Sequence, residues 1–424
     1  MNEADEAATR AWVLHPDIKS DPERRAADSA LAEAVSLAHA LPAIEVIGSE
    51  IVPLPRPQPG TLFGSGKIDA LKTQIKENEI GLVLVDGPVT PVQQRNLEKA
   101  WGCKLLDRTG LILEIFSDRA ATREGVLQVE MAHLAYQRTR LVRAWTHLER
   151  QRGGLGFVGG PGETQIEADR RAIDQQLVRL RRQLDKVVKT RSLHRAARAR
   201  VPYPIVALVG YTNAGKSTLF NYLTGAAVMA KDMLFATLDP TMRQVRLPSG
   251  PEVILSDTVG FVSDLPTALV AAFRATLEEV LEADVIVHVR DISHPETDLQ
   301  AQDVRGILDA LGVNKDTPQL EFWNKTDQLG PDEADAMRAR AARLEATHVG
   351  SALTGAGLDP LLAAVAEAVG GARHQEVLEL GYADGKRRAW LFDKGLVETE
   401  VRTDTGYRLT VYWSDTDRAR FSAL

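Results

Sequence analysis

The stretch GYTNAGKS, Gly210 to Ser217, decides the expected fold, because it has the G-x-x-x-x-G-K-[ST] spacing of a phosphate-binding loop. The apolar run IVALV at 205–209 precedes it as a strand, and TLFNYLTG follows it as a helix. In that context, the backbone amides from Asn213 to Thr218 can cradle phosphates at a helix N-terminus. We expect the Lys216 ammonium to bridge the β- and γ-phosphates and the Ser217 hydroxyl to bind Mg²⁺.

Three motifs downstream of this loop indicate which nucleotide it binds. DTVG ends the apolar strand EVILS, so Asp257 can hold Mg²⁺ through a water and the Gly260 amide can sense the γ-phosphate. NKTD follows the strand PQLEFW, and its Asp327 carboxylate can accept two hydrogen bonds from the guanine edge, which adenine does not supply. SAL, Ser351 to Leu353, offers a backbone amide to the guanine oxygen. In this order the motifs predict a GTP site.

The segment FATLDPT, 235–241, is expected to hold a threonine that completes the Mg²⁺ shell when a γ-phosphate is present. Thr237 and Thr241 are the two candidates. Thr237 is favoured, because Pro240 and the strand-like MRQVRL place Thr241 closer to the start of regular structure. The alternative is that Thr237 is an ordinary loop threonine.

The residues expected for hydrolysis are less complete than the motifs for binding. Phe261 follows DTVG where many GTP hydrolases carry a glutamine that orients water, and a phenyl ring cannot polarise a nucleophile. We therefore expect slow intrinsic hydrolysis that a partner accelerates by ordering the loops. The side-chain oxygen of Asn213 can help to coordinate a K⁺ ion near the phosphates, or Asn213 only stabilises the turn; both readings stay open.

The composition is that of an ordinary soluble globular protein of 424 residues, enough for two to four domains. The acidic start MNEADEAATR lacks the features of a signal peptide, and no apolar run is long enough to span a membrane. The single cysteine, Cys103, excludes an intrachain disulfide and suits the reducing cytosol. We therefore expect a cytoplasmic protein with Cys103 as a buried small hydrophobe.

A basic block lies within this chain of net charge −7. Residues 119–200 carry 18 Lys and Arg against 8 Asp and Glu, a net +10 that leaves −17 for the rest of the chain. A localised basic segment is typical of proteins that bind polyanions. A solvated helix face with spare charge is the alternative.

Four segments are expected along the chain. Residues 1–117 alternate strand and helix, including an Ala-rich helix at 23–39 and an apolar stretch at 103–116, and predict an α/β domain with parallel strands. Residues 202–371 predict a doubly wound α/β domain, whose ligands bind at the carboxyl ends of the strands. Residues 374–424 predict a small α+β domain.

The remaining segment, 118–200, has a helical pattern only. One apolar seam recurs at spacings of 7, 4, 3, 4 and 3: Ile166, Ile173, Leu177, Leu180, Leu184 and Val187. A helix at about 126–150 offers the facing surface, and the glycine-rich GGLGFVGGPG joins the two helices. This arrangement predicts a long antiparallel hairpin. Thr164 with Glu167 fits a capping box at the start of the second helix.

A second glycine-lysine sequence, GSGK at 64–67, does not fit the phosphate-loop pattern. The spacing of its upstream glycine is wrong, and Ile68 stands in place of the Ser or Thr. A plain helix-entry loop is favoured over a secondary nucleotide or RNA phosphate contact.

With these motifs the chain resembles the HflX GTPases of the translation-factor-related P-loop class. The matching stretches occur in family order: GGPGETQIEADRR, GYTNAGKSTLFNYLTG, FATLDPT, DTVGF, HVRDISHP, NKTD and SALTGAGLDPLL. The resemblance implies an N-terminal α/β domain and a helical hairpin ahead of a GTP-hydrolysing domain that uses Mg²⁺. It also implies binding to the 50S ribosomal subunit and its RNA, and some members of the family split stalled or idle 70S ribosomes. We expect a monomer when the protein is free, with no membrane partner.

Carried over to this chain, the family's residues define the expected sites. The GTP contacts are Gly210, Tyr211, Thr212, Asn213, Ala214, Gly215, Lys216, Ser217, Thr218, Phe235, Ala236, Thr237, Leu238, Asp239, Asp257, Thr258, Val259, Gly260, Asn324, Lys325, Thr326, Asp327, Ser351, Ala352 and Leu353. The catalytic candidates are Lys216, Thr237 and Gly260, and the Mg²⁺ candidates are Ser217, Thr237 and, through a water, Asp257. The expected RNA contacts are Arg152, Gly153, Gly154, Gly159, Gly160, Arg170 and Arg171.

One position departs from the family. Members often carry an arginine where this chain has Gly160, so Arg152 or Arg170 would have to supply that charge.

Two functions of different classes fit the sequence. In the first, bound GTP orders the loops around Thr237 and Gly260, and hydrolysis releases the protein from ribosomal RNA. In the second, the chain is an RNA- or ribosome-silencing module in which hydrolysis is incidental, an alternative that Phe261 keeps open.

Overall fold

The computed structural model describes ten stretches of the chain: residues 8–21, 24–151, 165–198, 203–226, 234–238, 240–248, 252–263, 277–370, 374–413 and 415–422. Several expected site residues lie outside these stretches: Arg152, Gly153, Gly154, Gly159, Gly160 and Asp239, together with the capping residue Thr164.

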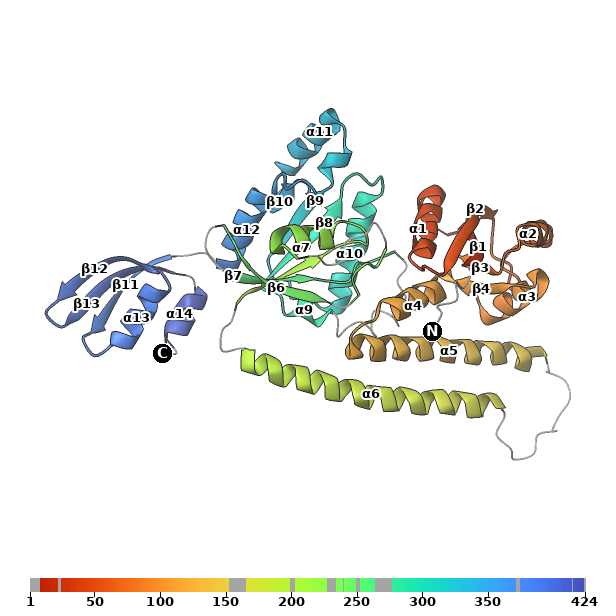
Figure 1. The fold of residues 1–424 in the computed structure, drawn as a ribbon, viewed down its shortest axis with the longest axis horizontal. Helices are drawn as coiled ribbons and strands as arrows, with labels where there is room; N and C mark the ends of the chain where they lie inside the picture. Colours follow the sequence, from red (N-terminus) through yellow and green to blue (C-terminus); the bar gives the residue numbers. More distant parts are fainter. Residues whose placement is uncertain are drawn as a thin grey trace, which may run out of the picture.

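The N-terminal elements form an α/β layer structure (Figure 1). They are β1 (Thr9–Ile18), α1 (Ala27–His39), β2 (Ile44–Leu54), α2 (Ser65–Glu77), β3 (Leu82–Val85), α3 (Pro91–Trp101), β4 (Lys104–Asp107) and α4 (Arg108–Arg119). The sheet has the order β2-β1-β3-β4, and every strand pair is parallel, as expected from the alternation with helices. All four residues of β3 are buried, because helices cover both faces of the sheet.

Two boundaries in this region differ from the expected ones. α1 begins at Ala27 rather than at residue 23, and the preceding Arg25 bonds instead to Glu33 and Glu296. The apolar stretch 103–116 is not one element, because the Asp107 carboxylate accepts a hydrogen bond from the Gly110 amide at 2.8 Å. That cap ends β4 and starts α4 within the same stretch.

The GSGK sequence lies at the entry to α2, with Gly64 as its N-cap. Lys67 forms an ion pair with Glu50 of β2. Its ammonium is therefore used within the domain, which agrees with the helix-entry interpretation.

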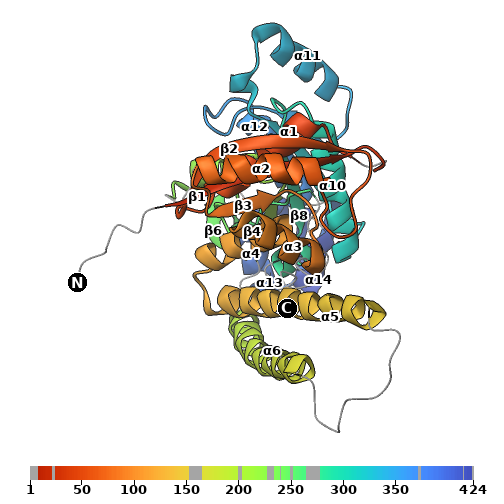
Figure 2. The ribbon, with the colours of Figure 1, turned by 90° about the vertical axis from the view of Figure 1, so that its right-hand side faces the viewer.

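Two long helices, α5 (Arg123–Gln151) and α6 (Gln165–Arg198), run side by side as the expected hairpin (Figures 1 and 2). The seam residues whose side chains the structure describes, Ile173 to Val187, face inward: Leu180 is 7% exposed, whereas Val178, off the seam, is 52% exposed. Arg138 of α5 and Asp174 of α6 form an ion pair at 3.0 Å. Burial along the seam and pairing at its edge hold the two helices together.

The central domain is built around a six-stranded sheet. Its elements are β5 (Ile205–Val209), α7 (Lys216–Thr224), β6 (Thr241–Arg246), β7 (Glu252–Asp257), α9 (Glu278–Leu281), β8 (Val285–Asp291), α10 (Thr297–Leu311), β9 (Gln319–Asn324), η2 (Thr326–Gln328), α11 (Pro331–Ala341), β10 (Thr347–Val349) and α12 (Leu358–Gly370). The strand order is β10-β9-β8-β5-β7-β6, in which only the edge strand β6 pairs antiparallel. The motifs that follow β5, β7, β9 and β10 therefore meet at one edge of the sheet.

The C-terminal residues form the expected small α+β domain, drawn in blue in Figure 1. Its elements are β11 (His374–Gly381), α13 (Gly385–Asp393), β12 (Val397–Thr403), β13 (Gly406–Trp413) and α14 (Asp415–Ser422). The strands form an antiparallel sheet in the order β11-β13-β12. A separate core, which includes Leu391, Trp413 and Phe421, fills the space between sheet and helices.

The N-terminal and central domains share one hydrophobic core. Phe116 of α4 packs edge to face on Phe235, with ring centroids 4.7 Å apart and planes at 78°. Ala34 and Leu37 of α1 belong to the same buried cluster as Phe261. The segments beside the expected GTP site therefore pack directly on the N-terminal domain.

Candidate nucleotide-binding site

The phosphate loop has the backbone that its glycines and asparagine permit. Gly210, Asn213 and Gly215 have φ values of 150°, 60° and 93°. A Cβ at Gly210 would lie 2.2 Å from the Val289 carbonyl oxygen, and one at Gly215 would lie 2.2 Å from Asn324 Nδ2. Glycine is needed at both places for conformation and for space.

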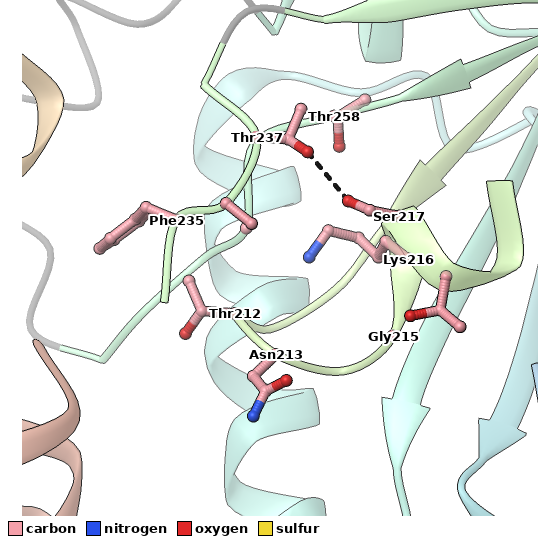
Figure 3. Close-up of a pocket in the computed structure, with 11 residues that line it drawn as sticks. Thr212, Asn213, Gly215, Lys216, Ser217, Phe235, Thr237 and Thr258 are labelled. Carbon is pink, nitrogen blue, oxygen red and sulfur yellow. Dashed lines mark hydrogen bonds between the residues drawn. The ribbon is translucent and has the colours of Figure 1, made fainter. Parts of the chain in front are cut away.

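Lys216 begins α7, and its side chain lies inside the curve of the loop (Figure 3). Its Nζ donates to the carbonyl oxygens of Gly210 at 3.1 Å and Tyr211 at 2.8 Å. Burial lowers the pKa of Lys216 to about 8, although the Asp257 carboxylate acts in the opposite direction. A buried ammonium held by two neutral oxygens favours an anion, such as a phosphate, at this loop.

Three oxygen-bearing side chains meet next to this lysine. Ser217 Oγ lies 2.9 Å from Thr237 Oγ1, and both hydroxyls donate to Asp257 Oδ2, at 2.7 Å and 3.0 Å. Figure 3 shows Thr237 and Ser217 reaching toward each other, Thr237 from a loop and Ser217 from the first turn of α7. Thr241, the other candidate, is instead the first residue of β6.

These oxygens fit a magnesium ion. Asp257 is fully buried, and its Oδ1 has no hydrogen-bond partner within the described residues. Burial raises the pKa of Asp257, against the effect of the Ser217 hydroxyl and the Lys216 charge, so a cation here would stabilise the carboxylate. Hydroxyl and carboxylate oxygens are the hard ligands that Mg²⁺ prefers. The described residues hold no group of three His, Cys, Asp or Glu side chains arranged for a metal, so phosphate and water would have to complete the shell.

The DTVG segment lies against the phosphate loop. The Thr212 amide donates to the Phe261 carbonyl at 2.7 Å, and the Phe261 amide donates to the Gly210 carbonyl at 3.1 Å. A Cβ at Gly260 would lie 2.8 Å from Thr212 Cγ2 and 3.1 Å from Lys216 Nζ. The Phe261 ring is 1% exposed and belongs to the core, so it does not face the site.

An open pocket lies at this edge of the sheet. It is lined by Thr212, Asn213, Gly215, Lys216, Ser217, Thr218, Phe235, Ala236, Thr237, Thr258 and Gly260. The structure thus brings together the expected residues of the phosphate end.

The guanine-end motifs are tied to the same loop. Asn324 Nδ2 donates to the Ala214 carbonyl, and the Ala352 amide donates to Asn324 Oδ1, both at 2.8 Å. Asp327 lies in η2 with an exposed side chain, as a carboxylate that receives a base requires. Lys325 Nζ lies 2.8 Å from Asp291 Oδ2. One asparagine therefore sets the spacing between phosphate loop, NKTD and SAL.

Other expected residues do not point into the cavity. Leu238 and Val259 are buried in the core, and the Phe235 ring points away from Lys216 (Figure 3). These residues can reach a nucleotide only through their backbone. Arg170 and Arg171 lie exposed on α6.

Sequence reasoning missed part of the surroundings of the site. The Tyr211 hydroxyl bonds to Glu33 and Ser263, and Arg108 donates to the Ser263 carbonyl. These partners come from distant parts of the chain, and no local motif marks them.

Comparison with known proteins agrees with this geometry. Residues 28–117 match the family model "GTP-binding GTPase N-terminal", residues 119–198 match "GTP-binding GTPase Middle Region", and residues 205–325 match "50S ribosome-binding GTPase". A GTPase HflX of Magnetococcus marinus is 49% identical over 92% of this chain and 88% of its own length. A GTPase HflX of Escherichia coli is 42% identical over 82% of each chain.

Among solved structures, a GTP-binding protein of Sulfolobus solfataricus in complex with GDP aligns with 85% of this chain and 98% of its own. Its sequence identity is 22% and its TM-score 0.45. Within the part of the chain that the structure describes, no helix is both long and apolar enough to cross a membrane.

The motifs, their assembly at one edge of the sheet and the matches over nearly the whole chain agree. This chain belongs to the HflX family of GTPases and is a GTP-hydrolysing enzyme.

Proposed function

We propose that this protein is a ribosome-associated switch that binds the 50S subunit in its GTP form and splits stalled or idle 70S ribosomes. The observation that carries the proposal is the convergence of Ser217, Thr237 and Asp257 beside the phosphate loop. A γ-phosphate there would fix two separate loops at once, and its loss would release them. The match of residues 205–325 to a family described as a 50S ribosome-binding GTPase supports the choice of partner.

Each part of the site has a proposed role. Amides from Asn213 to Thr218 bind the phosphates, Lys216 bridges the β- and γ-phosphates, and Asp327 selects guanine. Ser217 and Thr237 would hold Mg²⁺ directly and Asp257 through a water. Bound Mg²⁺ would neutralise the charge that develops on the phosphate oxygens. The Gly260 amide senses the γ-phosphate.

The hairpin is the proposed RNA-binding element. The glycines expected at its tip, Gly153, Gly154, Gly159 and Gly160, would allow close approach of backbone amides to RNA, and Arg152 would add positive charge. The exposed Arg170 and Arg171 of α6 add positive charge. Deleting residues 154–160 is expected to weaken ribosome action and leave GTP affinity unchanged, and a collapse of GTP affinity would contradict this role.

Cosedimentation with 50S subunits, in GDP and in a non-hydrolysable GTP analogue, tests the switch directly. We expect stronger binding with the analogue, and equal binding in both states would overturn the switch. T237A should remove the difference, because Thr237 is the residue that joins the second loop to Ser217. T241A is the matched control from the same segment, since Thr241 belongs to β6, and it should keep the difference.

The rate of hydrolysis separates the switch from a silencing module. We propose a slow intrinsic rate that ribosomes stimulate, because Phe261, the residue directly after DTVG, is buried and its ring cannot orient water. Multiple-turnover phosphate release should rise when 50S subunits are added. Absence of stimulation would favour the silencing module instead.

Three further assignments complete the proposal. Either Asn213 helps to coordinate K⁺ or it only stabilises the turn, and equal hydrolysis rates in KCl and NaCl would remove the K⁺ role.

The proposed domains are 1–117, 118–200, 202–371 and 374–424. The free protein is proposed to be a cytoplasmic monomer, which sedimentation equilibrium tests.

A further inference from the structure

Ser263, three residues beyond Gly260, is held by Tyr211 and Asp303 of the central domain and by Arg108 of the N-terminal domain. Its amide donates to the Tyr211 hydroxyl at 2.8 Å, and its Oγ lies 2.8 Å from the same hydroxyl. Its carbonyl accepts from Arg108 of the N-terminal domain at 2.9 Å. The end of the DTVGFVS segment is therefore bonded both to the phosphate loop and to another domain.

Arg108 is the centre of a buried charge network. It is 5% exposed and forms ion pairs with Glu33 and with Asp86, the latter at 2.6 Å. Tyr211 donates to the Glu33 carboxylate at 2.5 Å, so the phosphate loop joins the same network. The carboxylate of Asp86 also bonds to His15 Nδ1 at 2.8 Å.

Asp107, the residue before Arg108, bonds to the hairpin helix α5. Asp107 accepts from the Tyr136 hydroxyl and from Arg140, both at 2.5 Å, and these two residues lie on α5. The Arg140 guanidinium also stacks on the Tyr136 ring, 4.5 Å from its centroid. Two consecutive residues at the β4–α4 junction thus bind the hairpin on one side and the Ser263 backbone on the other.

This arrangement resists partial movement. Buried ion pairs that lose one partner are strongly destabilised, so their members keep their geometry or rearrange together. A helix cap fixes Asp107, because its Oδ1 also accepts from the Gly110 amide. Movement of Ser263 would therefore be passed to α4 and from there to α5, rather than absorbed by flexible side chains.

We propose that Asp107 and Arg108 form a joint that couples the Gly260–Ser263 segment to the hairpin helix α5, with Arg108 and Tyr211 as positioning residues for GTP hydrolysis. The proposal rests on the GTP site proposed above. Because coupling is reciprocal, nucleotide changes the hairpin and a partner bound to the hairpin changes the position of the Gly260 amide.

The test compares R108K and Y211F with the wild-type full-length protein. R108K keeps a positive charge between Glu33 and Asp86 and removes the planar fork that also reaches Ser263. Y211F keeps the ring and removes the hydroxyl. E296Q is the matched control, because Glu296 bonds to Arg25 across the same domain interface and touches neither Arg108, Tyr211 nor Ser263; it is linked to Glu33 only through Arg25.

Hydrogen–deuterium exchange of α5 amides is measured in GDP and in a non-hydrolysable GTP analogue, together with kcat, KM and GDP affinity. We expect a wild-type difference in α5 exchange of about fivefold or more between the two states. R108K and Y211F should lose that difference and lower kcat by about fivefold, with KM and GDP affinity within about twofold. E296Q should behave as wild type.

Each contrary result has a distinct meaning. Equal α5 exchange in GDP and analogue for the wild type overturns the joint. A preserved difference in Y211F or R108K overturns their positioning roles, and if R108K does not fold, Y211F decides alone. If the wild-type protein did not bind GDP, the proposed nucleotide site would be refuted instead. The affinity measurement detects that outcome separately.

Discussion

Gly260 shows how little space the site leaves at a single residue. The nearest atoms to an added Cβ include Thr212 Cα at 2.9 Å, which is backbone and cannot turn aside. G260A should therefore push DTVG away from the phosphate loop and lower kcat about tenfold or more, with GDP affinity changed much less. Phosphate-release assays measure this. G306A on α10, where a Cβ meets nothing within 4 Å, is the control and should keep full activity; equal rates for both variants would contradict the packing argument.

His288 predicts a pH dependence of stability. It lies in β8, 4% exposed, and burial lowers its pKa to about 3, with Arg290 acting in the same direction and Glu321 against it. The folded chain keeps His288 neutral, whereas the unfolded chain protonates it near pH 6.5. The free energy of unfolding therefore does not depend on His288 protonation above pH 6.5, and it decreases as the pH falls below that value. The loss should be up to about 1.4 kcal/mol per pH unit.

Urea unfolding at pH 7.5, 6.5 and 5.5 measures that slope. H288Q removes the titrating group and should flatten the dependence of the unfolding free energy on pH between 6.5 and 5.5. Identical slopes in H288Q and the wild type would refute the assignment.

The residues proposed to bind nucleotide could be predicted from the sequence, whereas their supporting partners could not. Lys216, Asp257 and Asp327 sit in short motifs that fold locally, so spacing alone identifies them. Glu33 and Arg108 reach the site from 178 and 155 residues away along the chain. No periodicity or motif encodes a pairing over such a separation.

At the scale of elements, α6 depends on its apolar seam. L180A removes a side chain that is 7% exposed and should destabilise the hairpin by about 2–3 kcal/mol. V178A changes a side chain that is 52% exposed and should cost less than about 0.5 kcal/mol. Hydrogen exchange of α6 amides compares the two variants, and equal protection in both would place the seam elsewhere.

The boundaries of helices and strands could be predicted only where the sequence pattern was clear. The seam of α6 was predictable, because its spacing fits one helix face, and the glycine-loop context fixed β5 and α7. The division of 103–116 into β4 and α4 was not, because apolar residues run through both. The Asp107 cap was the only local sign of this division, and a residue is recognised as a cap only once the amide that donates to it is known.

At the scale of the molecule, the shared core predicts joint unfolding. Phe116 and Phe235 belong to one cluster, whereas the C-terminal domain has its own. Scanning calorimetry should show the N-terminal and central domains melting together and the C-terminal domain separately. F116A should lower the free energy of unfolding for this joint transition by about 3–5 kcal/mol and impair nucleotide binding.

The matched control for this prediction is F63A. Phe63 is also fully buried but lies in the second core of the N-terminal domain, which contains no residue of the central domain. Its replacement should destabilise the N-terminal domain and affect GDP affinity less than F116A does. Equal loss of GDP affinity in both variants would contradict a direct link through Phe235.

The antiparallel pairing of β6 with β7 has a consequence for synthesis. Thr241 pairs with Asp257, so Thr237 and Asp257 are brought together by a local hairpin. Lys216 and Ser217 precede that hairpin, and Asn324 and the residues after it follow much later in the chain. As the chain leaves the ribosome from its N-terminus, the part of the site proposed to bind phosphate can form while the segment proposed to select guanine is still being made. Base selectivity is therefore the last property of the site that a nascent chain acquires.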